Sequence, residues 1–141
     1  MKGRSMILSP EKISELRSRA EAAAKASYSP YSTFAVGAAV LTASDKIFSG
    51  CNVENASYGL TNCAERTAIF SAVAAGERII TAVAIHTSTA HGTAPCGACR
   101  QVIFEFGPEA SVYSFSHAAE PSVIRITDLL PYAFGPSNLR D

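Results

Sequence analysis

The sequence predicts an α/β fold in which a mixed sheet carries helices on both faces. The first observation is the order of the expected elements along the chain, α-β-β-α-β-α-β-β-α. The second is the composition, because 48% of the 141 residues are apolar, which is enough to build a real core. The third is the nearly continuous apolar run at 35–42, which is typical of a buried strand. We expect a single domain spanning residues 1–141.

The first helix is expected to begin at Pro10. Ser9 is a suitable N-cap, Pro10 fits the first turn, and Glu11 places a negative charge at the positive end of the helix. Tyr28-Ser29-Pro30 ends the helix. Four apolar residues recur at helical spacing between these limits, namely Ile13, Leu16, Ala20 and Ala23.

A strand pair follows the first helix. The apolar run 35–42 forms the first strand, and residues 47–53 form the second. The polar segment Ser44-Asp45-Lys46 between them is a turn, so the pair is expected to be a β-hairpin.

Glycine and proline mark the ends of the remaining elements. Gly76 closes one helix, Gly107-Pro108 ends the next, and Pro131 stops the last. In chain order we expect a helix at 63–75, a strand at 79–86, a helix at 97–106, strands at 111–115 and 123–126, and a short helix from 127.

The charge balance limits the possible partners. The 12 Lys and Arg residues equal the 12 Asp and Glu residues, and the N-terminal cations are interleaved with Glu11, Glu15 and Glu21. A protein that grips a polynucleotide needs a basic stripe to neutralise phosphates. We therefore expect no nucleic acid polymer as a partner and a small substrate without a phosphate chain.

No segment of the chain is typical of membrane insertion or export. No apolar stretch reaches the ~20 residues of a membrane span, so no membrane partner is expected. The start, Met1-Lys2-Gly3-Arg4-Ser5, leads into no apolar run of signal-peptide length. A cytoplasmic location is expected, where cysteines are kept reduced.

Three cysteines and one glutamate predict a catalytic zinc site. Glu65 lies two residues after Cys63. Further along the chain, Pro95 directly precedes Cys96, and Cys99 follows three residues later. A structural zinc takes four protein ligands, whereas a catalytic zinc takes three and leaves the fourth position to water. A carboxylate near the first ligand and a later Pro-Cys-x-x-Cys are the signature of zinc deaminases that act on nucleobases. We expect one Zn²⁺ per chain, with Glu65 handling the protons of its water.

Two other interpretations of the cysteines remain open. Cys51 could join the other three in a closed, structural four-cysteine zinc site. A lone Cys-x-x-Cys also occurs in redox motifs, although a disulfide does not fit a reducing compartment. We expect Cys51 to pack as a small apolar side chain instead.

The placement of these residues at helix starts has electrostatic consequences. Three thiolates on Zn²⁺ leave a net charge near −1, which helix N-termini and Arg66 can offset. Glu65 lies two positions after Cys63, and such residues diverge by ~200° within a regular helix. The two side chains can converge only if Cys63 is a cap residue with non-helical angles. The alternatives are a surface ion pair for Arg66 and an exposed helix position for Glu65.

Further upstream, polar and aromatic residues are candidates for substrate binding. Strand alternation places Asn52 and Glu54 on one face and Val53 on the other. An amide and a carboxylate at a strand end can hold a diol such as a ribose, or can be a turn-forming polar cluster. Phe34 can stack on a base, or can be part of the core.

Together these residues resemble the small, homotetrameric cytidine deaminases over most of the chain, from about Ile13 to Leu139. The motifs that carry the resemblance are SPYSxFxVGAA at 29–39, GCNVENASY at 50–58, CAERTA at 63–68, PCGACRQ at 95–101 and LLPxxF at 129–134. The resemblance implies a three-layer α/β/α fold around a five-stranded mixed sheet. It implies zinc-dependent hydrolytic deamination of cytidine and deoxycytidine in pyrimidine salvage.

The resemblance also implies a role for each matched residue. Zinc is bound by Cys63, Cys96 and Cys99, Glu65 is the proton shuttle, and Arg66 compensates the charge of the thiolates. Ribose is held by Asn52 and Glu54, and Phe34 stacks on the base. Tyr58 and Phe134 correspond to positions that complete the site across subunit boundaries.

Two positions depart from the family pattern, and two other functions remain as alternatives. Ala94 stands where a serine often precedes Pro-Cys, and Tyr132 stands where small residues are common. Neither is expected to touch the chemistry. Blasticidin-type deaminases share the Cys-Ala-Glu and Pro-Cys-x-x-Cys motifs but look unlike this chain at Phe34 and at Asn52-x-Glu54. The alternatives are a deaminase of another heterocycle, such as blasticidin S, and a non-catalytic, zinc-stapled binding module.

Overall fold

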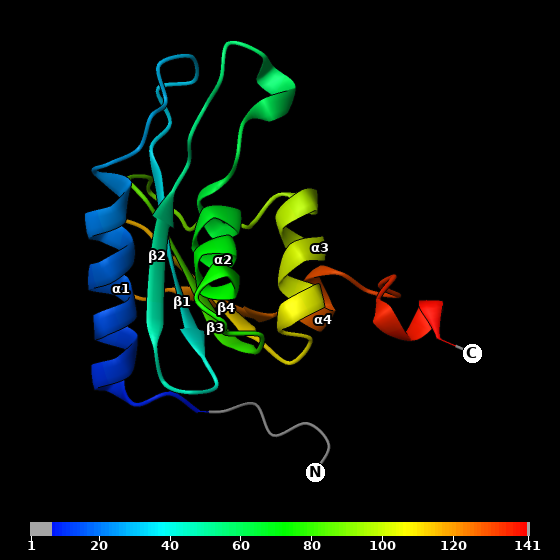
Figure 1. Ribbon diagram of the computed structural model, residues 1–141. Helices are drawn as coiled ribbons and strands as arrows, with labels where there is room; N and C mark the ends of the chain where they lie inside the picture. Colours follow the sequence, from blue (N-terminus) through cyan, green and yellow to red (C-terminus); the bar gives the residue numbers. More distant parts are fainter. Residues whose placement is uncertain (1–6, 141) are drawn as a thin grey trace.

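The computed structural model describes residues 7–140 and contains a five-stranded sheet with helices on both faces (Figure 1). The strand order is β2-β1-β3-β4-β5. The β3–β4 pair is parallel and the other three pairs are antiparallel, so the sheet is mixed, as predicted. The strands are β1 (Val36–Thr42), β2 (Ile47–Cys51), β3 (Ile80–Thr87), β4 (Ser111–Phe115) and β5 (Ser122–Arg125). The helices are α1 (Pro10–Ala24), α2 (Ala64–Ala74), α3 (Gly97–Phe106), α4 (Ile126–Leu129) and the 3₁₀ helices η1 (Tyr58–Leu60) and η2 (Pro136–Leu139).

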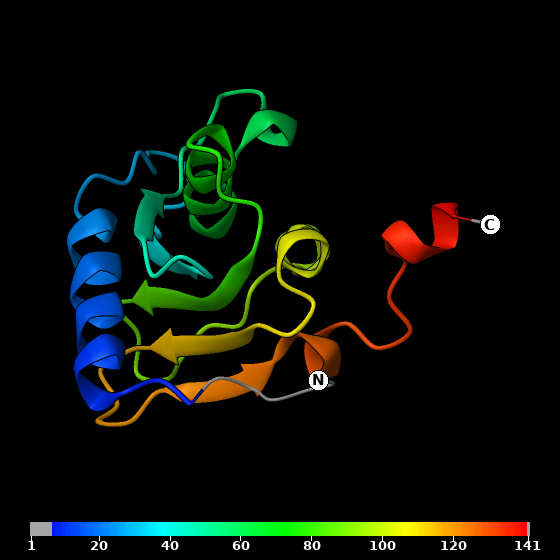
Figure 2. The same ribbon diagram turned by 60° about the horizontal axis from the view of Figure 1, so that its bottom comes forward.

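Side-chain alternation along the central strands divides the core into two layers. Ala39 and Leu41 of β1 pack with α1 on one face, whereas Ala38 and Val40 pack with α2 on the other. Figure 2 shows α1 on one side of the sheet and α2 and α3 on the opposite side. The arrangement is the three-layer α/β/α sandwich that the resemblance implied.

Two glycines allow helices to approach the sheet closely. A Cβ atom at Gly37 of β1 would lie 1.9 Å from the carbonyl oxygen of Ala20 in α1. A Cβ atom at Gly50 of β2 would lie 2.5 Å from the backbone nitrogen of Ala68 in α2. No side chain fits at these distances, so the two glycines set how deeply α1 and α2 sit on the sheet.

The predicted elements are present, with shifts at a few ends. The strand expected at 47–53 ends at Cys51, because the Val36 N–H donates to the side chain of Asn52 and not to its backbone carbonyl, which interrupts the ladder. β5 ends at Arg125 rather than 126, and Ile126 is instead the first residue of α4. The sequence did not predict η1 and η2, which are single turns without apolar periodicity. The expectation about residues 1–5 lies outside the described residues.

Two segments extend away from the body of the domain. One is the β2–α2 connection, which carries η1, and the other is the C-terminal tail after α4 (Figure 1). Both present apolar side chains to solvent, including Tyr58, Leu60, Tyr132, Phe134 and Leu139. Between residues 7 and 140, no helix combines the length and the apolar character that crossing a membrane requires.

Candidate active site

The three predicted zinc-binding cysteines lie at the N-termini of two neighbouring helices. Cys63 is the N-cap of α2, with φ −73° and ψ 156°, and Cys96 is the N-cap of α3, with φ −66° and ψ 169°. Cys99 is buried in the first turn of α3. Both caps have the extended backbone that was required for Cys63 and Glu65 to converge, because a cap side chain can turn toward the start of its helix.

The sulfur atoms are close enough to share one metal ion. The Sγ atoms of Cys63 and Cys96 are 3.6 Å apart, and all three sulfurs lie within 4.8 Å of one another. Thiolates on a tetrahedral zinc are ~3.8 Å apart when the Zn–S bonds are ~2.3 Å. The donor set therefore fits zinc and leaves one coordination position open. Within residues 7–140, this is the one cluster of three or more metal-binding side chains.

Cys51 lies on the other face of the sheet. It pairs with Gly37 across the β1–β2 ladder, and paired residues point to the same face. The missing Cβ of Gly37 would point at Ala20 of α1, so Cys51 points toward α1 as well. The thiol cluster lies on the α2 side, which argues against the closed four-cysteine site.

Arg66 and Cys99 stabilise the thiolate form of Cys63. The neighbouring Cys99 thiol and the Arg66 guanidinium lower the pKa of Cys63 to about 5. The Nη2 atom of Arg66 is 3.3 Å from the Cys63 sulfur. The pKa of Cys99 is raised, because this thiol lies beside the Cys63 sulfur and is buried.

Glu65 is a buried carboxyl group beside the thiol cluster. It lies in the first turn of α2 and is only 4% exposed. Burial raises the pKa of Glu65 above its ordinary value, and the negative charge of Cys63 adds to this effect. A carboxyl group with a raised pKa holds a proton more readily than an exposed one, which suits a group that must both accept and donate protons. Glu65 is thus not the exposed helix glutamate that was the alternative.

A short backbone bridge brings the end of β2 next to Cys63. The N–H groups of Val53 and Asn62 each donate to the carbonyl oxygen of the other at 2.9 Å. Cys63 follows Asn62 directly, so the bridge fixes where the first thiol lies. The side-chain amide of Asn62 also donates to the Thr67 Oγ1 atom of α2 at 3.0 Å, which ties the bridge to the helix.

Asn52 lies inside the site and holds the loop between α1 and β1. Its Nδ2 atom donates to the Phe34 carbonyl oxygen at 2.7 Å, and its Oδ1 atom accepts from the Val36 N–H at 2.9 Å. The Ser27 hydroxyl also donates to Oδ1. Asn52 is buried, whereas Val53 is 43% exposed, as strand alternation predicted.

Glu54 holds the same loop two residues further along. Its Oε1 atom accepts from the backbone N–H groups of Tyr31 at 2.9 Å and Ser32 at 3.1 Å. The Ser32 hydroxyl donates to Oε2, and this bond, followed by the backbone bonds, lowers the pKa of Glu54. The side chain is therefore a buried carboxylate that already accepts hydrogen bonds.

Most of the predicted site residues line a single cavity of about 200 Å³. Six of them line it, namely Phe34, Asn52, Glu54, Cys63, Glu65 and Cys96. Two of the three thiols and Glu65 therefore share one cavity with the Asn52 amide and the Glu54 carboxylate, and this cavity has room for a small substrate.

Sequence reasoning missed several other residues that line this cavity. Ser32, Thr61 and Thr93 contribute to the wall, and each lies in a loop without a periodic pattern. Ser32 had a usable signal, since it is a polar residue two positions before the predicted stacking residue Phe34. Ala94 also lines the cavity, two residues before Cys96.

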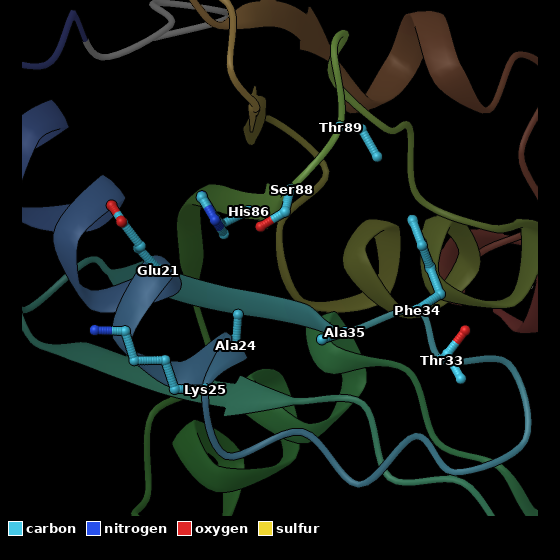
Figure 3. A pocket seen from close by; sticks show the side chains of 9 residues that line it. All are labelled: Glu21, Ala24, Lys25, Thr33, Phe34, Ala35, His86, Ser88 and Thr89. Carbon is cyan, nitrogen blue, oxygen red and sulfur yellow. The ribbon is translucent and has the colours of Figure 1, made fainter.

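Phe34 also borders a second cavity, of about 320 Å³, on the α1 side of the sheet. Glu21 of α1, Lys25 at the C-cap of this helix and His86 of β3 line this space (Figure 3). Burial lowers the pKa of His86, so its ring is neutral at pH 7. None of the three thiols borders this cavity, and Phe34 is a wall common to both spaces.

Two predicted substrate-binding residues lie outside the thiol-containing cavity of their own chain. Tyr58 is 74% exposed and lines a shallow pocket that adjoins Glu54, with its ring centroid 5.7 Å from that of Tyr31. Phe134 is 59% exposed and lies in the C-terminal tail. The structure does not bring Phe134 to the cavity of the same chain.

The sequence model of the cytidine and deoxycytidylate deaminase zinc-binding region matches residues 10–115 of this chain. The chain belongs to this family. A relative from Halalkalibacterium halodurans, named cytidine deaminase, is 45% identical over 120 residues, which cover 84% of this chain and 91% of the relative. A cytidine deaminase from Mycobacterium tuberculosis is 44% identical over 124 residues, covering 88% of this chain and 90% of the relative.

A solved structure of the same family has the same fold. The crystal structure of cytidine deaminase from Burkholderia pseudomallei matches with a TM-score of 0.83 and 49% sequence identity, covering 90% of this chain and 100% of that chain. The likeness confirms the predicted α/β fold with its five-stranded mixed sheet. The family also confirms zinc as the cofactor, and the cluster of Cys63, Cys96 and Cys99 is able to hold it.

Proposed function

We propose that this deaminase domain, as a single unit, converts cytidine and 2′-deoxycytidine to uridine and 2′-deoxyuridine with release of ammonia. The observation that carries the proposal is the shared cavity, in which a buried Glu65 and two cysteines of the thiol cluster lie together with Asn52 and Glu54. The relatives named cytidine deaminase support the choice of substrate.

Cys63, Cys96 and Cys99 would hold the zinc ion, which supplies Lewis-acid chemistry that makes water nucleophilic at neutral pH. Hydrolysis at C4 of cytosine removes both protons of the attacking water, one at the attack and one when the C4 carbonyl forms, and adds one proton at N3 and one to the leaving amine. We assign these transfers to the Glu65 carboxyl, because its raised pKa favours alternation between its two protonation states. Arg66 offsets the negative charge of the thiolates.

We assign the ribose to Asn52 and Glu54 and the base to Phe34. Glu54 has a lowered pKa and is ionised at neutral pH, so its oxygens can accept hydrogen bonds from a sugar hydroxyl. Both side chains also fix the loop that carries Phe34. Sugar binding and base stacking therefore depend on the same set of hydrogen bonds, which favours a nucleoside over a free base.

An absorbance assay tests the proposed activity. Purified protein with measured zinc content is mixed with cytidine, deoxycytidine, cytosine, cytidine monophosphate and blasticidin S, and the loss of the cytosine band is followed. We expect turnover of both nucleosides, with the Glu65→Gln variant as the inactive control. Turnover of blasticidin S alone would show that the substrate is this compound and not a nucleoside. Zinc binding with no turnover of any compound would favour the non-catalytic, zinc-stapled binding module. A gel shift with single-stranded DNA and RNA tests for a polymer substrate.

We further propose that the protein is a homotetramer whose sites are completed by neighbouring chains. The support is the apolar surface on the two extended segments, which carry Tyr58 and Phe134 outside the thiol-containing cavity of their own chain. Exposed aromatic side chains of this kind are typical of subunit interfaces. A role in pyrimidine salvage in the cytoplasm agrees with this proposal, because the three cysteines must be reduced to bind zinc.

A further inference from the structure

Helix α3 contains a predicted zinc ligand, and it also forms hydrogen bonds with the C-terminal tail. Cys99 belongs to its first turn, and the next two residues, Arg100 and Gln101, reach from α3 to backbone carbonyls outside the helix. The hydrogen bonds of Arg100 and Gln101 have no part in the proposed deamination step. They connect the metal cluster to the segment that carries Phe134.

Arg100 joins two parts of the chain that are far apart in sequence. Its Nε atom donates to the Pro95 carbonyl oxygen at 2.8 Å, directly before the zinc ligand Cys96. Its Nη1 atom donates to the Leu129 carbonyl oxygen at 2.9 Å, at the end of α4. The planar guanidinium thus fixes the beginning of the tail relative to the Cys96 loop.

Gln101 binds the tail at Phe134 itself. The Nε2 atom of Gln101 donates to the Phe134 carbonyl oxygen at 2.8 Å. The next residue, Gly135, lies against the Phe104 ring of α3, so closely that a Cβ atom would be 2.7 Å from Cε1 of the ring. The Gly135 N–H also donates to the Asn138 side chain at 2.8 Å, which closes the turn at η2.

These contacts fix the backbone of Phe134 but leave its ring free. The ring is exposed, and the tail extends beyond α3 and α4, away from the sheet (Figure 2). Tyr132 has a positive φ of 53°, which turns the chain between α4 and Phe134. A side chain that is mostly exposed while its backbone is held in place is available for contact with another molecule.

We propose that Gln101 and Arg100 are positioning residues that hold Phe134 ready for the active site of a neighbouring subunit. The inference rests on the proposed shared site, and it adds what orients the residue that is shared. Gln101 contacts the tail alone, so its replacement should affect only the neighbour's active site, which receives that tail. Arg100 acts on the tail and also on the Cys96 loop, and therefore on its own zinc as well.

The two residues should differ in their measurable effects. Loss of one neutral hydrogen bond in Gln101→Ala is expected to raise KM by roughly 2- to 10-fold, with kcat and zinc content unchanged. Arg100→Gln is expected to raise KM and also to release zinc faster to a chelator. Glu105→Ala, an exposed position on the same helix, is the matched control and should change neither quantity.

Subunit exchange separates this inference from the shared site itself. The Gln101→Ala chain is mixed with an excess of the inactive Glu65→Gln chain, whose tail is intact. Active sites should then receive an intact tail from the neighbour and regain the KM of the unmodified enzyme. The same mixture with Phe134→Ala is the reference.

Recovery for Phe134→Ala but not for Gln101→Ala, despite demonstrated exchange, would overturn the positioning role and leave the shared site in place. An unchanged KM for Gln101→Ala would overturn it as well. No effect of Phe134→Ala on KM would remove the shared site and the positioning role together.

Discussion

The Nη2 atom of Arg66 lies 3.3 Å from the Sγ atom of Cys63. Cys63 is the N-cap of α2 and Arg66 lies in the first turn of the same helix, three residues later. The contact places a permanent positive charge beside the thiol cluster. It raises the pKa of Arg66 and helps to lower that of Cys63. A negatively charged three-thiolate zinc is a weaker Lewis acid, so a fixed cation beside it favours the reaction.

Replacing Arg66 by glutamine should weaken catalysis more than folding. We expect turnover to fall by about tenfold or more, because one charge-assisted hydrogen bond to a ligand sulfur is lost. In metal-free protein, Cys63 is a thiolate above pH 5, so its alkylation should lose speed as the pH falls through about 5. In Arg66→Gln this midpoint should move up by about one pH unit. Unchanged turnover and an unchanged midpoint would show that the helix N-termini compensate the charge alone.

Replacing Glu65 by glutamine should remove activity while the fold and the metal remain. General acid and base groups contribute ~10²–10⁴-fold, and a group that serves several proton transfers should reach or exceed the upper value. We expect zinc content and nucleoside binding, measured by calorimetry, to be retained. Turnover within tenfold of the unmodified protein would exclude Glu65 from the mechanism.

Two cysteine variants distinguish the open zinc site from a closed one. Cys96→Ser should lose both zinc and activity, because it removes one of three ligands. Cys51→Ser should retain both, because Cys51 faces α1 on the opposite side of the sheet. Metal content per chain, measured by elemental analysis, decides between the outcomes. Loss of zinc from Cys51→Ser would restore the four-cysteine alternative.

Replacing Phe134 by alanine should raise KM without removing zinc. The physical reason is that an aromatic ring of a neighbour shields the substrate from water, and the site works better when it is desolvated. Steady-state kinetics with cytidine and sedimentation of the same samples provide the measurement. A fully active monomer would contradict both the tetramer and the shared site.

Local signals in the sequence were sufficient for most of the fold. Ser9 is the N-cap of α1, and its side chain accepts a hydrogen bond from the backbone of Lys12, as its residue type predicted. Gly76 ends the α2 region with a φ of +97°, a value that glycine adopts without strain. These features depend on a few adjacent residues, and so they are visible in sequence alone. The end of β2 was missed because it depends on a hydrogen bond from the Val36 N–H to the Asn52 side chain, which the sequence does not show.

For the active site, the sequence by itself determined the residue types and their spacing. Three thiols, one carboxyl group and the helix starts that orient them are enough to predict zinc and an acid–base group. The tertiary structure alone decided that Cys51 points away from the cluster and that Ala94 lines the cavity. It also decided that the Phe134 backbone is anchored to α3 by Gln101. These facts depend on strand pairing, on the Val53–Asn62 bridge and on the anchoring of the tail by α3, and such contacts join residues that are distant in the chain and share no local pattern.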